Sequence, residues 1–92
     1  MNKHNRLRAE VIERDGCCME CGAPGEEVHH IISRRYDDAW DVRNMIFLCK
    51  ACHAVAGNHW VKVRHIRLLT RRYGYDYENM GELWQGLVRE AQ

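Results

Sequence analysis

The sequence predicts a small α+β domain in which two short strands lie among four helices. Two apolar runs have the length of strands, at residues 28–32 and 44–49, and polar or turn-forming residues bound both. Three other segments place apolar side chains at helical spacing, and a further helix is expected after the second run. A chain of 92 residues has room for one small core, which often needs a metal ion or disulfides as a staple.

The N-terminal helix is predicted over residues 4–14. Side chains recur at i+4 in two pairs, Leu7 with Val11 and Arg8 with Ile12. Gly16 ends the helix, and residues 17–27 contain the glycines and the proline that are typical of turns.

The first strand is predicted at Val28 to Ile32 and the second at Asn44 to Cys49, joined by the polar segment SRRYDDAWDVR. A helix is expected from about Lys50. The first strand contains two adjacent histidines, His29 and His30, which must point to opposite faces because side chains alternate along a strand.

Two more helices complete the prediction. In residues 59–73 one face carries Val63, Ile66, Leu69 and Tyr73, and another face carries Arg64, Arg67 and Arg71. Asn79-Met-Gly-Glu82 resembles a capping box at the start of the last helix. Its apolar stripe, which belongs either to the core or to a dimer surface, consists of Met80, Leu83, Trp84, Leu87 and Val88.

Composition places the chain among water-soluble globular proteins, with 29% charged and 46% hydrophobic residues. No apolar run is long enough to span a bilayer, and the first ten residues lack the apolar stretch of a signal peptide. We therefore expect a cytoplasmic protein without a membrane partner, in a bacterium or a phage-infected host. In that reducing compartment five cysteines indicate metal ligands rather than disulfides.

Four of the cysteines form two C-x2-C pairs, Cys18 with Cys21 and Cys49 with Cys52. Two such pairs are typical of a structural site in which four thiolates surround Zn²⁺. Cys17 is an alternative to Cys18, but it would give a C-x3-C spacing. His53 follows the last cysteine, and a closed four-cysteine site has no place for it, so it packs, caps a helix or binds a second metal ion.

These motifs together resemble those of the HNH endonucleases, in particular small stand-alone phage or bacterial members. The resemblance runs through RAEVIERDGCCMECG, VHHIISRR and RNMIFLCKACH. It implies a single domain over 1–92: a zinc-stabilised ββα-metal (His-Me finger) core at 8–56 with an N-terminal helix, and a C-terminal helical extension at 59–91.

Carried over residue by residue, the resemblance makes His30 the general base and Asn44 the residue that orients it. His29 and His53 become ligands of one catalytic divalent ion, which could be Mg²⁺, Mn²⁺, Ni²⁺ or Zn²⁺. Family members often place another ligand one helical turn after the final histidine, but here that position is Gly57. Asn58, His59 or water could take its place.

The activity implied is metal-dependent hydrolysis of DNA phosphodiester bonds, leaving 5′-phosphate and 3′-hydroxyl ends. Such hydrolysis needs a base with a pKa near neutrality and a cation to neutralise phosphate charge, and imidazole and a divalent ion supply these. DNA contacts are expected from Arg34 and Arg35 beside the histidines and from Arg64, Arg67 and Arg71. The last three lie in a stretch, residues 58–75, that holds five basic residues and no acid, although a solvated helix face explains that charge equally well.

The other hypothesis is a non-catalytic, zinc-stabilised module that binds nucleic acid. The complete set of His30, Asn44 and His53 favours the enzyme, because a module that only binds does not need all three. The chain is expected to act as a monomer or a homodimer, with phage packaging or recombination proteins as candidate partners.

Overall fold

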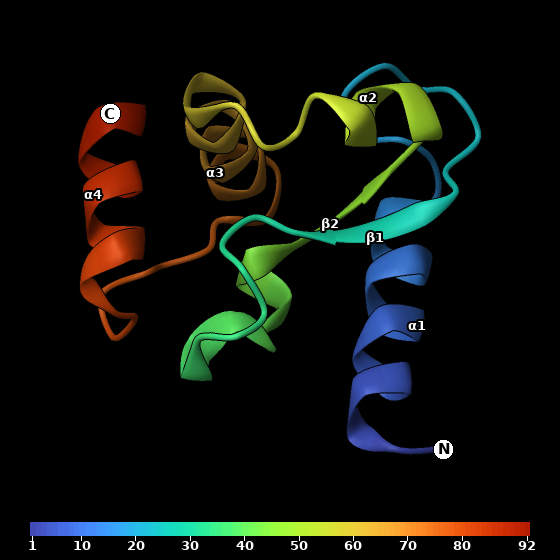
Figure 1. The fold of residues 1–92 in the computed structure, drawn as a ribbon, viewed down its shortest axis with the longest axis horizontal. Coiled ribbons are helices and arrows are strands. Elements are labelled where there is room, and N and C mark those ends of the chain that lie inside the picture. Colours follow the sequence, from blue (N-terminus) through green and yellow to red (C-terminus); the bar gives the residue numbers. More distant parts are fainter.

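Two antiparallel strands lie at the centre of the molecule, with helices on both sides (Figure 1). The computed structural model describes all of residues 1–92. The elements in chain order are α1 (Lys3–Asp15), β1 (Glu27–His30), the 3-10 turns η1 (Asp37–Ala39) and η2 (Val42–Asn44), β2 (Met45–Leu48), α2 (Lys50–Ala54), α3 (His59–Tyr73) and α4 (Glu82–Ala91). The predicted α+β class and the order α, ββα, α, α are confirmed.

The two faces of the sheet pack against different helices. In the register of the strands His29 lies opposite Ile46 and His30 lies opposite Met45, so each pair shares a face. Ile46 belongs to the larger core, which includes residues of α3 and α4. Met45 belongs to a smaller core with Val11 of α1. The adjacent histidines therefore face opposite sides of the sheet, as the strand period predicts.

Both strands are shorter than predicted because their ends bond to turns instead. Ile31 and Ile32 leave the ladder and donate their backbone N–H groups to the carbonyl and side-chain oxygens of Asn44, each at 2.9 Å. Asn44 itself ends η2 rather than starting β2. Cys49 becomes the N-cap of α2, where its sulfur accepts a hydrogen bond from the N–H of Cys52.

The C-terminal helices form part of the main core. The predicted bounds of α3 are confirmed, and its apolar face is buried through Val63, Ile66 and Leu69. They share one hydrophobic cluster with residues of β2 and with the cysteine region. None of the helices is both long and apolar enough to cross a bilayer.

The start of α4 differs from the prediction. Gly81 is its N-cap and no side chain caps the helix, so the capping box at Asn79 is wrong. Leu83, predicted in the apolar stripe, is 49% exposed, whereas Met80, Trp84 and Leu87 are buried. Leu83 instead lines a hollow at the surface between α3 and α4, together with His59 and Lys62.

Candidate functional site

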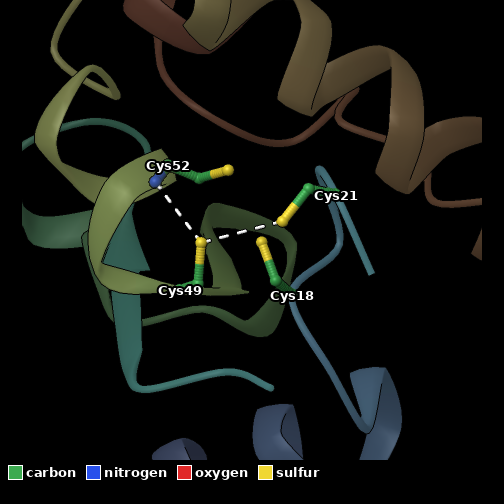
Figure 2. Close-up of side chains that lie close together, drawn as sticks. All are labelled: Cys18, Cys21, Cys49 and Cys52. Atoms are coloured by element: carbon green, nitrogen blue, oxygen red, sulfur yellow. Dashed lines mark hydrogen bonds between the residues drawn. The ribbon is translucent and has the colours of Figure 1, made fainter. Parts of the chain in front are cut away.

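The four cysteines of the two C-x2-C pairs lie together at one end of the sheet (Figure 2). Cys18 and Cys21 come from the loop after α1, and Cys49 and Cys52 from the first turn of α2. Their sulfur atoms surround a common space and all lie within 4.8 Å of one another. Cys17 is exposed and is not part of this cluster.

The cluster has the dimensions of a tetrahedral zinc site. Zinc–sulfur bonds of about 2.3 Å place neighbouring sulfur atoms about 3.8 Å apart, and Cys21 Sγ lies 3.7 Å from Cys49 Sγ. Burial opposes ionisation of the Cys18 thiol, but hydrogen bonds from the backbone at Cys49, Cys21 and Glu20 outweigh it and lower its pKa to about 6. The donor set and its spacing fit Zn²⁺, which binds thiolates.

The histidine pair lies in a separate pocket of about 610 Å³. Ten residues from α1, β1, the loop after β1 and α2 line it: Arg8, Ile12, Glu26, Glu27, Val28, His29, His30, Ser33, Arg34 and His53. The structure thus brings together three of the four residues predicted for catalysis and binding of a second ion.

On one side of β1, His29 faces two other histidines. Its ring centroid lies 5.0 Å from that of His53 and 6.1 Å from that of His65, which is fully buried on α3. Burial and then the neighbouring His53 and His65 lower the pKa of His29 to about 3. Its Nε2 atom, like that of His30, is buried without a hydrogen-bond partner, as expected of a neutral imidazole.

The carboxylate of Glu27 contacts Nδ1 of His53 at the edge of the pocket. Glu27 stands two residues before His29 on β1, so both side chains lie on the same face of the strand. A carboxylate on one ring nitrogen fixes the tautomer of an imidazole and leaves the other nitrogen as an acceptor, which is a common arrangement around metal-binding histidines.

His29, His53 and Glu27 nevertheless do not form a compact cage. The cysteine cluster is the one group of three or more histidine, cysteine or acidic side chains whose donor atoms all lie within 4.8 Å. An ion between His29 and His53 would therefore have two protein nitrogens as ligands and would take the rest from water or phosphate. Such a site is open to several divalent metals.

On the other side of β1, His30 packs against an aromatic side chain. Its ring meets the indole of Trp40 edge-on, with centroids 4.4 Å apart and planes at 70°. Burial and then the positive charges of Arg34 and Arg8 lower the pKa of His30 to about 4. The imidazole is therefore neutral at pH 7 and able to accept a proton.

Asn44 is fully buried and uses its whole amide group. Oδ1 accepts hydrogen bonds from Ile32 N–H and from the indole N–H of Trp84, both at 2.9 Å. Nδ2 donates to the carbonyl oxygens of Ile32 and Ala39, both at 3.0 Å. The residue ties the end of β1 to the loop before β2 and to α4.

The predicted DNA-binding arginines lie in different surroundings. Arg34 lines the pocket, whereas Arg35 is exposed and donates to Tyr36 Oη at 3.3 Å. On α3, Arg64 pairs with Glu20 at 2.9 Å and Arg67 donates to the carbonyl of Ala91 at 3.0 Å. Neither these two nor the exposed Arg71 lines the histidine pocket.

The two candidates for a further ligand near Gly57 are engaged elsewhere. Asn58 caps α3 by accepting from the N–H groups of Trp60 and Val61. His59 Nε2 lies 2.7 Å from a carboxylate oxygen of Glu90. Neither side chain lines the pocket.

Sequence reasoning missed four residues of this region: Glu27, Arg8, Trp40 and His65. The position of Glu27 could have been predicted, because residues two apart on a strand lie on the same face, here the face of His29. The others had no local signal, since their places depend on how α1, α3 and the loop between the strands pack on the sheet.

Residues 18–59 match the family model of the HNH endonuclease. The matched segment contains both cysteine pairs, the histidine pair, Asn44 and His53. No curated protein and no solved structure matches the sequence significantly.

Proposed function

Because residues 18–59 form an HNH endonuclease domain, a family that indicates nuclease-type activity or nucleic-acid binding, we propose that the chain is a metal-dependent DNA endonuclease. It hydrolyses phosphodiester bonds with a histidine general base and one divalent cation. The observation that carries the proposal is the pocket in which β1 directs His30 to one face and His29, near His53, to the other.

His30 is the general base. Burial and the charges of Arg34 and Arg8 lower its pKa to about 4, below the near-neutral value expected of a catalytic imidazole, so the ring is neutral at pH 7. A bound phosphate offsets the arginine charges and favours the protonated ring, and His30 then accepts a proton from the water that attacks phosphorus. The bond from phosphorus to the 3′ oxygen then breaks, which leaves a 5′-phosphate and, after protonation from solvent, a 3′-hydroxyl. Asn44 acts through the backbone: three of its four side-chain hydrogen bonds go to Ile32 and Ala39 in the loop that follows His30, and the fourth goes to Trp84 of α4.

His29 and His53 hold the divalent ion. When bound, the ion neutralises charge on the phosphate and on the departing oxygen. Neutral imidazoles are required for this, and the low pKa of His29, about 3, keeps its ring neutral over the working range of pH. The four cysteines hold a separate structural zinc ion.

A plasmid nicking assay tests the function. Protein that retains its zinc should convert supercoiled plasmid to open circles after addition of Mg²⁺, Mn²⁺ or Ni²⁺, and should be inactive after dialysis against buffer without a divalent cation. His30→Ala should lower the rate about 10²–10⁴-fold, the usual contribution of a general base. His59→Ala serves as a matched control, because His59 lies outside the pocket. DNA binding without cleavage under all three metals would instead identify a non-catalytic module.

A further inference from the structure

The side chain of Arg8 on α1 lies in the pocket beside the proposed base. Its guanidinium carbon is 4.9 Å from the centroid of the Trp40 ring, a cation–π distance. The same indole stacks on His4, with centroids 3.6 Å apart, and meets His30 edge-on. The indole of Trp40 thus contacts both the guanidinium group of Arg8 and the imidazole of His30.

The charge of Arg8 has no acidic partner. Its one side-chain hydrogen bond goes to the amide oxygen of Asn5, at 3.1 Å, and it forms no ion pair. Arg34, which also lines the pocket, has no ion pair either. The arginines that are paired with carboxylates, such as Arg14, Arg43 and Arg64, all lie outside the pocket. Two unneutralised guanidinium groups therefore accompany His30.

A neutral base between two uncompensated cations suits an anionic substrate. Guanidinium groups bind phosphate oxygens through paired hydrogen bonds, and stacking on an indole restricts Arg8 before DNA arrives, which reduces the entropy lost on binding. Two acids line the pocket, and both are engaged away from His30: Glu27 contacts His53, and Glu26 accepts a hydrogen bond from Lys50 N–H at the start of α2. The pocket therefore has a cationic end at His30 and a carboxylate-bearing end at His53.

We propose that Arg8, held on Trp40, binds the DNA backbone phosphate next to the bond that is cut and so brings that bond to His30. This inference rests on the proposed function for its substrate, but it concerns a residue on the N-terminal helix, before residues 18–59 that the family model matches. Trp40 is a positioning residue, because it acts through Arg8 and His30.

Fluorescence anisotropy with a short labelled DNA duplex tests the proposal. The titrations are run at several salt concentrations in buffer without a divalent cation, so that binding is measured without cleavage. Arg8→Ala should weaken binding roughly tenfold at low salt. The slope of log K against log salt should fall by about 0.9, the value for one lost phosphate contact. Arg8→Lys should keep the slope, because it keeps the charge.

Arg6→Ala is the matched control. Arg6 precedes Arg8 by two residues on α1, is exposed, forms no ion pair and does not line the pocket. The proposal is overturned if Arg8→Ala and Arg6→Ala change the slope equally, or if Arg8→Ala lowers the melting temperature while the slope stays that of the wild type. The binding titrations contain no added divalent cation, so their result does not depend on cleavage. If the wild type binds DNA but never cuts it, the proposed function is contradicted, while the contribution of Arg8 to DNA binding can still be measured.

Discussion

The two histidines of β1 are adjacent in sequence, but their side chains have different surroundings. His29 faces the side chains of His53 and His65, and His30 faces Trp40 and two arginines. Both rings are kept neutral, but by different neighbours: His29 mainly by burial with further imidazoles nearby, His30 by burial with guanidinium groups nearby. One side chain can therefore bind a cation while the next accepts a proton.

The lowered pKa of His30 makes folding depend on pH. Its pKa falls from 6.5 to about 4, so below pH 6.5 the unfolded chain binds a proton that the folded chain does not. The contribution of His30 to stability is thus complete above pH 6.5 and is lost as the pH falls toward 4. Urea unfolding from pH 7.5 to pH 4.5, at fixed zinc and without the second ion, should show a shallower decline for His30→Gln than for the wild type. Parallel declines would mean that His30 titrates normally in the folded protein.

Glu27 offers a second test at the scale of one residue. If its carboxylate holds His53 Nδ1, Glu27→Gln should weaken binding of Mn²⁺ roughly 10–100-fold, the usual effect of removing such a partner of a metal ligand. Calorimetric titration of Mn²⁺ into zinc-loaded protein measures this directly. Glu26→Gln is the control, because Glu26 accepts from Lys50 N–H and does not contact His53. Equal Mn²⁺ affinities of Glu27→Gln and Glu26→Gln would show that Glu27 does not support the metal site.

At the scale of elements, the cysteine pairs join the loop after α1 to the end of β2. The backbone supports this junction, since Cys18 N–H donates to Ala23 O and Met19 N–H donates to Phe47 O. Gly25 lies so close to the ring of Phe47 that a Cβ atom there would overlap it. The loop that carries Cys18 and Cys21 is therefore packed against β2, and a metal ion would fasten it there.

Loss of the ion should unfold much of this end of the molecule. Cys49→Ser removes one ligand but keeps a cap on α2, because a serine hydroxyl also accepts from Cys52 N–H. It should lower the melting temperature and the zinc content together, because binding energy in a small metal site is also folding energy. Elemental analysis with thermal unfolding measures both, and Cys17→Ser is the control outside the cluster. Folded wild-type protein that contains no zinc would contradict the assignment.

The sequence predicted some elements better than others for physical reasons. The bounds of α3 were predictable because Asn58 caps it and its apolar side chains repeat over four turns. The ends of the strands were not, because Ile31 and Ile32 remain apolar and buried after leaving the ladder. The cysteine spacing predicted the cluster without knowledge of the fold, since each pair is a local motif.

At the scale of the whole molecule, the sheet separates two cores and, with them, two sets of functional side chains. The larger core lies on the side of α3 and α4, and the smaller one lies against α1. Asn44 links the C-terminal helix to the sheet, because the indole N–H of Trp84 in α4 bonds to the amide that closes the turn before β2. The C-terminal helices thus support the loop next to the histidines, a contact across 40 residues that no local pattern indicates.

The part of the pocket that distant segments build could not be predicted either, because no local sequence pattern indicates contacts between segments far apart in the chain. Motif spacing brought His29, His30 and His53 together, whereas Arg8 reaches the pocket only because α1 packs across the face of β2 that carries Met45. The arginines of α3 were predicted from charge alone. The structure pairs Arg64 with Glu20, a partner that lies far away in sequence.

We propose that His30 and His29 perform different tasks on opposite faces of one strand. Calorimetric titration of Mn²⁺ into zinc-loaded His30→Ala and His29→Ala, beside plasmid nicking by the same samples, tests it most directly. His30→Ala should bind Mn²⁺ as the wild type does and lose cleavage, because a base acts on water. His29→Ala should lose Mn²⁺ affinity together with cleavage, and excess Mn²⁺ should restore part of the rate. Loss of Mn²⁺ binding in His30→Ala with normal binding in His29→Ala would contradict the account by reversing the two roles.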